Sequence, residues 1–580
     1  MPRGLRLRLE QLVASVYPEA DTAALAERLA QAFWPGARRP RRRGRNPGNT
    51  LWSQRDAYVI TYGNSIIDGE HKPLDLLRDF ARRYLADAIT GIHILPYFPF
   101  TSDDGFAVTD YYAVNSALGA WEDISRIAEE FDLMSDLVLN HCSSQSAWFS
   151  AYLQGHAPYD RFFREAEPDD DLSAVVRPRS HPLLRRVETA RGPRHVWCTF
   201  SHDQVDFDFS NPEVLEAFLD VLRFHIDRGV RTLRLDAVAF LWKEPGTPSI
   251  HLRQTHEIVR LIRLLLDFDE APVILITETN VPNAENLSYF GNRNEAHAVY
   301  NFSLPPLILH ALLNGTSEYL RSWQMAMPPA QLGCTYFNFT ASHDGIGLRP
   351  AEGLIPEDDI ARMIETVRGF GGLVSMRRMA DGTERPYELN VALFDALQGT
   401  VAGRDDLGIP RFLCSQAIAM ALEGIPAFYI HSLLATRNDT EGVAKLGYNR
   451  AINRHRWDYA TLEARLADPA SDTAQVFAAM KRMLKVRARQ PAFHPNATQF
   501  TLQLGDAIFG FWRQSFDRSQ SIFILANVTA ETVTIPAAAL NLIDGNDWHD
   551  LLSGERVDEL RGDIALAPYQ SRWISNGVAR

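Results

Sequence analysis

Eight apolar stretches of strand length recur along the middle of the chain, most of them followed by an amphipathic stretch of helix length. They are, in order, DAYVITYG, ITGIHILPYF, DLMSDLVLNH, RTLRLDAV, PVILITET, AHAVYNF, CTYFNFTASHD and IPAFYIHSLL. Near-continuous apolar strands separated by helices are typical of a parallel sheet covered by helices. Eight such units within roughly 430 residues predict an α/β fold, the (β/α)8 TIM-type barrel with insertions.

The rest of the chain predicts additions to this barrel. We expect a small helical extension with a basic linker at 1–50, the barrel at 51–495 and, where alternating strands replace helices, an antiparallel β domain at 496–580. Within the barrel we expect an inserted lobe after the third strand, at about 143–205, and a loop-rich insertion at about 345–400.

Composition excludes two classes of protein. The formal net charge of −13 argues against a general nucleic-acid binder. No window reaches the ~20 apolar residues of a membrane span, and the N-terminus is too charged for a signal peptide, so we expect a cytoplasmic protein without a membrane partner. The basic run at 37–45 is expected to be a solvated linker, with an anion-binding or RNA-binding patch as the alternative.

The cysteines give no sign of a metal site or a disulfide. Cys142, Cys198, Cys334 and Cys414 are scattered among mostly apolar neighbours, without a CxxC or Cys/His spacing. We expect them to be reduced thiols in the core.

Polar side chains stand where four of the predicted strands end. They are Asn140 and His141, Arg234 and Asp236, Glu278 and Asn280, and His343 and Asp344. In a barrel the carboxyl ends of the strands meet at one mouth, so these side chains are expected to converge. A single strand-end Asp is as often a helix cap or a salt-bridge partner. Three carboxylates at one mouth are harder to explain as structure, because clustered like charges are costly unless they are used.

Three carboxylates with a neighbouring Arg and two His match the needs of a retaining glycosidase site. One carboxylate attacks the anomeric carbon, and a second, kept protonated, gives its proton to the departing oxygen. A third orients sugar hydroxyls and favours the positive charge that develops on the ring. Either His, taken alone, is more often an ordinary buried side chain.

Four short motifs carry a family resemblance. DLVLNH, RLDAV, TETN and ASHDG resemble, in order and spacing, the motifs of the α-amylase superfamily, and the match covers the whole barrel. The resemblance implies that Asp236 is the nucleophile, Glu278 the general acid/base and Asp344 the transition-state stabiliser. It also implies that Arg234 holds Asp236 ionised and oriented through charge-assisted hydrogen bonds.

Further stretches look like the sucrose phosphorylase subgroup of that superfamily. They are HILPYFPFTSDDGFAVTDY, SLPPLILHAL, HDGIG and GYNRAINRHRW. On this pattern Asp104 and Arg450 would grip the glucose hydroxyls, Phe106 would lie under the ring, and His141 and His343 would bind sugar hydroxyls. Such a closed pocket admits one glucosyl unit, so starch and glycogen are expected to be poor substrates.

The inserted lobe offers cations for phosphate. VVRPRS places Arg177 and Arg179 where the resemblance implies a phosphate-binding Arg. A guanidinium suits phosphate, which must approach a glucosyl-Asp beside two acidic groups. The alternative is two surface arginines in a loop.

Positions that face the leaving group differ from those of sucrose phosphorylases. Asn280 stands where those enzymes usually have His, and Glu388 where they usually have Gln. With AFLWKEPGTPSIHL, ITETNVP, ASHDGIGLRP and DGTERPYELN, the chain looks most like the glucosylglycerate phosphorylases. For a glycerate carboxylate, Arg349 is the candidate cation, with Asn280 as a neutral donor and Glu388 accepting hydrogen bonds from the glycerate hydroxyls. Tyr387 is a further candidate substrate-binding residue.

The activity implied by this resemblance is reversible phosphorolysis of 2-O-α-D-glucosyl-D-glycerate to α-D-glucose 1-phosphate and D-glycerate by double displacement. The alternatives are a sucrose or glucosylglycerol phosphorylase, a hydrolase or transglucosidase, and a non-catalytic sugar-binding protein. We expect small-molecule partners only and no organic cofactor or metal, although Asn140 lies where related amylases bind calcium. Oligomeric state and the physiological direction are left open.

Overall fold

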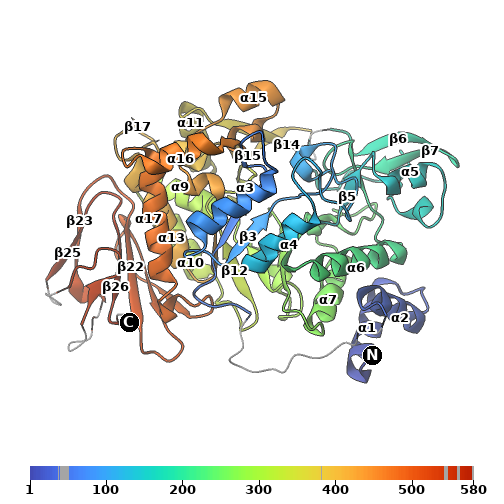
Figure 1. Cartoon of the computed structure of the whole chain (residues 1–580), viewed down its shortest axis with the longest axis horizontal. Coiled ribbons are helices and arrows are strands. Elements are labelled where there is room, and N and C mark those ends of the chain that lie inside the picture. Colours follow the sequence, from blue (N-terminus) through green and yellow to red (C-terminus); the bar gives the residue numbers. More distant parts are fainter. Residues whose placement is uncertain are drawn as a thin grey trace.

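Eight parallel strands close into a barrel, which confirms the predicted (β/α)8 fold (Figure 1). The structure is a computed structural model and describes residues 1–36, 38, 51–179, 181–379, 382–540, 542, 547–557 and 562–577. The barrel strands are β1 (Tyr58–Thr61), β3 (Gly91–Ile94), β4 (Asp132–Val138), β9 (Val230–Asp236), β10 (Ile274–Thr277), β11 (Ala298–Tyr300), β12 (Thr335–Asn338) and β18 (Ile425–Tyr429).

The strands are apolar on both faces because side chains fill the barrel interior and helices cover its outside. All four residues of β10 are buried. The register sets the level of the functional side chains, since Leu235 of β9 pairs with Thr277 of β10. The next residues, Asp236 and Glu278, therefore leave the barrel at the same level.

Helices between the strands pack an apolar face on the barrel. In α6 (Pro212–Asp227), Val214 and Phe218 are buried four residues apart, and the Asn211 side chain caps the first turn. The other helices of this part are α3 (Pro73–Phe80), α4 (Trp121–Glu130), α7 (Arg253–Asp267), α8 (Asn283–Leu287), α9 (Leu304–Asn314), α10 (Glu318–Ala326), α12 (Leu393–Ala396), α13 (Gly408–Ala421), α14 (Ile430–Leu433), α15 (Thr440–Leu446), α16 (Tyr459–Ala467) and α17 (Asp472–Arg487). Short strands here are β2 (Ile66–Ile67), β16 (Gly399–Thr400), β17 (Gly403–Arg404) and β19 (Trp457–Asp458).

A lobe projects from the barrel between β4 and β9 (Figure 1). It contains β5 (His141–Ser143), α5 (Ala147–Leu153), β6 (Leu184–Thr189), β7 (Gly192–Trp197) and β8 (Gln204–Asp206). Strands β5 and β8 pair antiparallel with His141 opposite Asp206, which fastens the lobe to the end of β4.

The segment after β12 is more regular than the loops expected at 345–400. It contains β13 (Ile346–Gly347), α11 (Glu357–Gly369), β14 (Leu373–Arg378) and β15 (Glu384–Asn390). The strands form one sheet in the order β13, β15, β14. The many charges of SMRRMADGTER hide this hairpin in the sequence, because most of β14 is only partly buried and shows no apolar core face.

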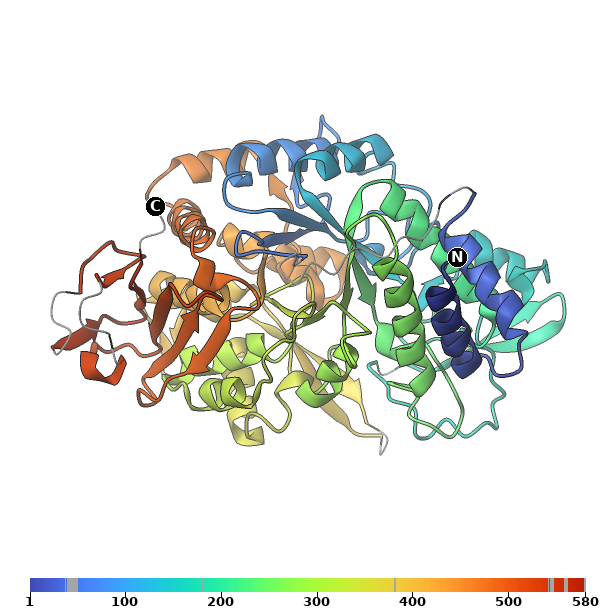
Figure 2. The ribbon, with the colours of Figure 1, turned by 90° about the horizontal axis from the view of Figure 1, so that it is seen from below.

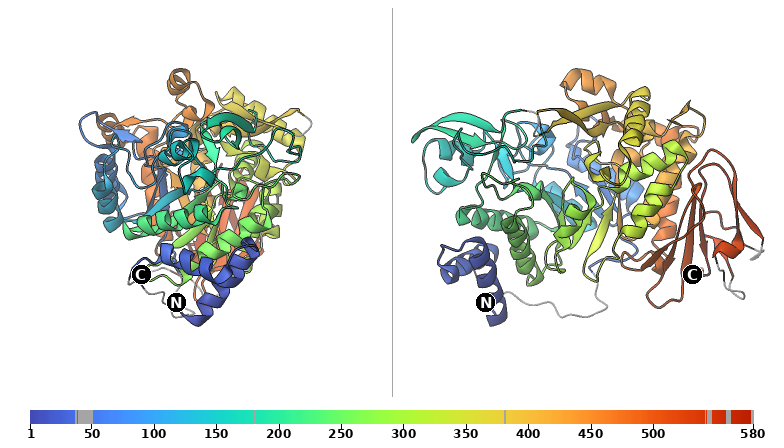
Figure 3. Two further views of the ribbon diagram at one scale, coloured as in Figure 1. Left: turned by 90° about the vertical axis from the view of Figure 1, so that its right-hand side faces the viewer. Right: turned by 180° about the vertical axis from the view of Figure 1, so that it is seen from behind.

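The N-terminal helices and the C-terminal strands lie at opposite ends of the molecule (Figures 2 and 3). Helices α1 (Arg3–Val16) and α2 (Thr22–Phe33) pack on α7 and α6, and the Tyr17 hydroxyl donates a hydrogen bond to the Phe209 carbonyl over 3.0 Å. Of the basic run at 37–45 only Arg38 lies within the described residues, and it pairs with Asp227 at 2.6 Å.

The C-terminal part is antiparallel β structure. Its main sheet has the order β20 (Thr498–Thr501), β21 (Ile508–Gln514), β22 (Ser521–Asn527), β26 (Ser571–Ser575) and β24 (His549–Asp550), and β23 (Val533–Pro536) pairs with β25 (Asp563–Leu566). The four cysteines are free and buried, as predicted. None of the helices in the described ranges combines the length and apolar composition that a membrane crossing needs.

Candidate active site

The carboxyl ends of the barrel strands open into one pocket that contains the three predicted catalytic carboxylates. Asp236 is the last residue of β9, Glu278 follows β10, and Asp344 follows β12. The other predicted residues that line the pocket are Phe106, His141, Arg177, Arg179, Arg234, Asn280, His343, Arg349, Tyr387 and Arg450. Asp104 and Glu388 are not among its lining residues.

The Asp236 carboxylate is held by a guanidinium of its own strand. Arg234 lies two residues earlier, on the same side of β9, and its Nη1 donates a hydrogen bond to Asp236 Oδ1 over 2.8 Å. The same nitrogen pairs with Asp136 of β4, whose Oδ2 lies 2.6 Å from His93 Nε2. These linked buried contacts fix the orientation of the Arg234 guanidinium.

Glu278 is tied to the end of β9 through the backbone. The N–H of Ala237 donates a hydrogen bond to Glu278 Oε2 over 3.1 Å. Ala237 has a left-handed backbone, with φ of 49°, which turns the chain sharply away from the strand direction after Asp236. The two carboxylates therefore lie side by side at the mouth of the barrel.

The protonation of the three carboxylates differs. Burial raises the pKa values of Asp236 and Glu278, and that of Asp236 lies well above its usual range although Arg234 lowers it. Arg234 opposes this effect at Asp236 and favours its ionised form, so the proton of the pair belongs on Glu278. Burial also favours protonated Asp344, but Arg450 and Arg234 outweigh it and lower the pKa of Asp344. An ionised Asp344 thus lies beside a pair that retains a proton.

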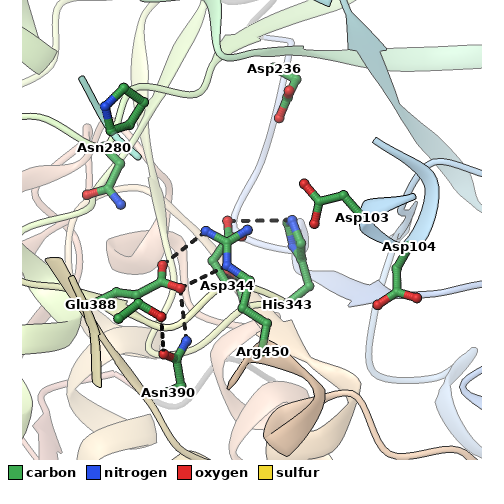
Figure 4. Close-up of polar contacts among 12 residues, drawn as sticks. Asp103, Asp104, Asp236, Asn280, His343, Asp344, Glu388, Asn390 and Arg450 are labelled. Carbon is green, nitrogen blue, oxygen red and sulfur yellow. Dashed lines mark hydrogen bonds and ion pairs between the residues drawn. The ribbon is translucent and has the colours of Figure 1, made fainter. Parts of the chain in front are cut away.

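Arg450 joins Asp344 to Glu388 (Figure 4). Its Nη1 lies 2.5 Å from Asp344 Oδ1, and its Nε donates to Glu388 Oε1 over 2.8 Å. Asn390 donates to the same Glu388 oxygen over 2.9 Å, and Glu388 is only 1% exposed. The prediction that Glu388 contacts glycerate hydroxyls is therefore corrected, because its acceptors are occupied by Arg450 and Asn390.

The loop after β3 turns Asp103, not Asp104, into the pocket (Figure 4). Asp104 Oδ2 instead accepts a hydrogen bond of 2.7 Å from Arg454 Nη1 and contacts the Tyr448 hydroxyl. Gln204 Nε2 donates to Asp103 Oδ2 over 3.3 Å. Both aspartates have positive φ, 54° and 47°, and their side chains point apart. This corrects the prediction that placed Asp104 against glucose.

Two histidines and Phe106 form the wall next to Asp103. The rings of Phe106 and His343 are stacked, with centroids 5.0 Å apart and an interplanar angle of 8°. Burial lowers the pKa values of His141 and His343, which keeps both imidazoles neutral. Gln204 Nε2 lies 3.2 Å from His141 Nε2. Neutral rings suit hydrogen bonds with sugar hydroxyls.

The same pocket carries the residues predicted for the leaving group and for phosphate. Asn280 Nδ2 donates to the Tyr387 hydroxyl over 3.4 Å. The Arg179 guanidinium lies over the Tyr387 and Phe200 rings, 5.7 and 5.9 Å from their centroids. Arg177 lines the same pocket, and burial lowers its pKa. A guanidinium held in this orientation would stabilise an anion bound next to it.

Arg349 begins a short 3-10 helix, Arg349–Ala351, after β13. It lines the pocket, and its Nη2 lies 3.6 Å from Glu285 Oε2. That carboxylate also lies 3.0 Å from His251 Nε2, so Glu285 lies next to both side chains.

Sequence reasoning missed several lining residues. Four of them are Asp103, Phe200, Gln204 and Arg377. Asp103 had a usable signal, because it stands beside Asp104 in the same motif. The other three lie in the inserted lobe and in the β14–β15 hairpin, where no strand-end pattern singles out one polar residue from its neighbours.

Asn140, where the resemblance places calcium, contacts a lysine. Lys243 Nζ lies 2.8 Å from Asn140 Oδ1 and donates to the Phe240 carbonyl over 2.8 Å. The same ammonium lies 3.2 Å from Asp206 Oδ2. A cation already stands among these oxygens, so the residues do not fit a calcium ion. Within the described ranges no group of three or more His, Cys, Asp or Glu is arranged to hold a metal.

Comparison with known proteins shows which family the chain belongs to. Residues 83–344 match the α-amylase catalytic domain. The glucosylglycerate phosphorylase of Spirochaeta thermophila is 43% identical over 90% of this chain and 90% of its own length. The chain belongs to the α-amylase family. Within that family it is also 40% identical to the glucosylglycerate phosphorylase of Escherichia coli, over 90% of this chain and 92% of that one.

Some relatives within the α-amylase family are more distant. The glucosylglycerol phosphorylase of Marinobacter adhaerens is 29% identical over 71% of this chain and 83% of its own length, and the sucrose phosphorylase of Bifidobacterium adolescentis is 26% identical over 87% of this chain and 97% of its own length. A crystal structure of sucrose 6F-phosphate phosphorylase from Thermoanaerobacter thermosaccharolyticum has the same fold, with a TM-score of 0.72 at 23% identity over 88% of this chain and 98% of that one. The family resemblance drawn from the four strand-end motifs is thereby confirmed.

Proposed function

We propose that this chain is a retaining glycoside phosphorylase, a glycosyltransferase of the hexosyl type. It reversibly converts 2-O-α-D-glucosyl-D-glycerate and inorganic phosphate into α-D-glucose 1-phosphate and D-glycerate. One observation carries the proposal: a single pocket places a cluster of carboxylates against a wall of arginines. Carboxylates serve glucosyl transfer, and the arginines suit the two anions, phosphate and glycerate, that exchange the glucosyl group. The 40 to 43% identity to glucosylglycerate phosphorylases supports the same substrate.

In the first step Asp236 attacks the anomeric carbon, and the bond from that carbon to the glycerate oxygen breaks. Glu278, whose pKa burial raises, gives its proton to the departing oxygen. A β-glucosyl ester forms on Asp236, and D-glycerate leaves. Asp344, held ionised by Arg450, stabilises the positive charge that develops on the ring.

In the second step an oxygen of phosphate attacks the same carbon and the ester bond to Asp236 breaks. Glu278, now ionised, takes the proton that the attacking hydroxyl loses. Two inversions give net retention, so the product is α-D-glucose 1-phosphate. Arg177 and Arg179 bind the phosphate and offset its repulsion from the neighbouring carboxylates.

The glucosyl unit lies against the wall of Asp103, Phe106 and the two neutral histidines. Asp103 replaces Asp104 in this role, because only Asp103 reaches the pocket. On the other side of Glu278, Arg349 binds the glycerate carboxylate, and Asn280 and Tyr387 contact its polar groups. We further propose a cytoplasmic location, supported by four buried free thiols, and small-molecule partners only.

A hydrolase or transglucosidase on this scaffold is the main alternative class, and phosphate dependence separates the two. The test supplies α-D-glucose 1-phosphate with D-glycerate, glycerol, fructose or water and measures phosphate release. We expect D-glycerate to give the highest kcat/KM and water the lowest rate. Faster release with fructose or glycerol would replace the proposed acceptor, and release that is independent of any acceptor would make the enzyme a hydrolase.

A further inference from the structure

We propose that Arg377 is a second carboxylate-binding side chain of the aglycone subsite, where it acts together with Arg349 as a clamp of two guanidinium groups. This inference rests on the proposed function, since it assumes an anionic aglycone. It concerns a residue of the β14–β15 hairpin, for which the sequence motifs imply no role.

The fold places Arg377 on the aglycone side of Glu278. The residue stands near the end of β14, lines the pocket, and is only 12% exposed in its side chain. Tyr387 of the facing strand β15 lines the pocket as well and accepts a hydrogen bond from Asn280, two residues after Glu278. Arg377 therefore lies on the wall that the departing glycerate faces.

Arg377 and Arg349 line the same pocket, and their positive charges repel each other. Burial lowers the pKa of Arg377, and the positive charge of Arg349 lowers it further, against the opposite effect of Glu352. Two buried guanidinium groups on one wall cost free energy unless an anion lies against them. The arrangement is therefore suited to a bound anion.

The carboxylates that hold these two arginines leave donors free. Arg377 Nη2 pairs with Glu352 Oε1 at 2.5 Å, and Arg349 Nη2 lies 3.6 Å from Glu285 Oε2. Both acids are partly exposed, at 46% and 42%. Arg377 Nε is buried and has no hydrogen-bond partner among the described residues. Each guanidinium thus lies beside one acid, and its other N–H groups have no acid partner among the described residues.

The ligand that this pair fits is a small carboxylate. D-glycerate offers two carboxylate oxygens, one for each guanidinium, in charge-assisted hydrogen bonds. Glycerol has the same carbon chain with a neutral hydroxymethyl group in place of the carboxylate. It offers no charged partner to the remaining N–H groups of the two arginines, so the clamp selects against it.

A competition experiment separates acceptor choice from donor binding. The full-length enzyme receives α-D-glucose 1-phosphate with D-glycerate and glycerol together, and the ratio of glucosylglycerate to glucosylglycerol is measured at early times. Both acceptors attack the same glucosyl-enzyme, so any effect of Arg377 on the donor phosphate cancels from the ratio. The variants are Arg377→Met, Arg349→Met and the control Arg385→Met. Arg385 pairs with Arg377 across the hairpin, but its side chain is 59% exposed and it does not line the pocket.

We expect the product ratio to fall at least tenfold in Arg377→Met and in Arg349→Met, and to stay within twofold in Arg385→Met. Arg377→Lys keeps the charge without the planar guanidinium and should restore part of the ratio. This second variant keeps the test decisive if the Met variant misfolds. An unchanged ratio in folded Arg377→Met, with wild-type enzyme preferring D-glycerate, overturns the inference alone. A wild-type enzyme without that preference overturns the proposed function instead.

Discussion

Both carboxylate oxygens of Glu388 accept hydrogen bonds from Arg450, Oε1 from Nε over 2.8 Å and Oε2 from Nη2 over 3.0 Å. The third nitrogen of the same guanidinium, Nη1, lies 2.5 Å from Asp344 Oδ1. A bidentate pair fixes the plane of a guanidinium. Glu388 therefore positions Asp344 through Arg450, although the motif comparison predicted that it would contact the aglycone.

Glu388→Gln should lower kcat/KM for glucosyl transfer by roughly 10- to 100-fold with every acceptor, because an amide replaces one of the two oxygens that hold Arg450. The measurement is phosphate release from α-D-glucose 1-phosphate with D-glycerate and with glycerol. Glu384→Gln, an exposed change on the same strand, is the matched control. A loss confined to D-glycerate would restore Glu388 to the aglycone subsite.

Asp236→Asn should abolish turnover, since no glucosyl ester can form. Glu278→Gln should slow glucosyl transfer most from donors with poor leaving groups, because only these need the proton. Rates with α-D-glucosyl fluoride and with glucosylglycerate compare the two cases. The carboxyl groups of Asp236 and Glu278 should lie about 5 to 5.5 Å apart in a crystal structure, and a β-configured product would reject the retaining mechanism.

Asp103 and Asp104 should respond differently to the same change. Asp103→Asn is expected to lower kcat/KM by about 10- to 100-fold through a lost charge-assisted hydrogen bond to glucose. Asp104→Asn weakens the hydrogen bond with Arg454 and should lower the thermal midpoint more than Asp103→Asn does. Activity and unfolding measured on both variants decide the assignment. Equal losses of activity would show that the loop moves as one unit.

Much of the fold and of the candidate site could be predicted from the sequence, and the predictions that were wrong have identifiable physical causes. The barrel and its strand ends follow from periodicity, because buried parallel strands must be apolar and their carboxyl ends must converge. The choice between Asp103 and Asp104 depends on two consecutive left-handed residues, which no apolar pattern encodes. The role of Glu388 depends on a pairing with Arg450, 62 residues later, that only the folded hairpin creates.

Activity should survive chelation, because Lys243 supplies the positive charge beside Asn140 and Asp206. We expect EDTA dialysis to leave glucosyl transfer unchanged and added Ca²⁺ to have no effect. Lys243→Met should destabilise the fold by roughly 3 to 5 kcal/mol, because it leaves the buried Asp206 without its cation. Loss of activity in EDTA that Ca²⁺ restores would contradict this assignment.

Glu423, just before β18, should make stability depend on pH. Burial raises its pKa from 4.5 to about 7, and the backbone N–H of Ala330 donates to its Oε1 over 2.8 Å. The folded state then binds more protons than the unfolded state between these two pH values, so the free energy of unfolding falls as pH rises through this window. Glu423→Gln should remove a cost on the order of 3 kcal/mol above pH 7. Thermal unfolding at pH 5 and pH 8 tests this, and an equal effect at both would refute it.

The β14–β15 hairpin is separated in the sequence from the strand ends that carry the carboxylates, which makes it a target for engineering the choice of acceptor. Arg377 and Tyr387 of the acceptor subsite lie in this hairpin, so a graft of residues 373–390 from a relative could shift acceptor preference while leaving β9, β10 and β12 untouched. Such a graft includes position 388, whose partner Arg450 lies outside it. A transplanted hairpin with a different residue at 388 would leave Arg450 misaligned, so the two positions must be exchanged together.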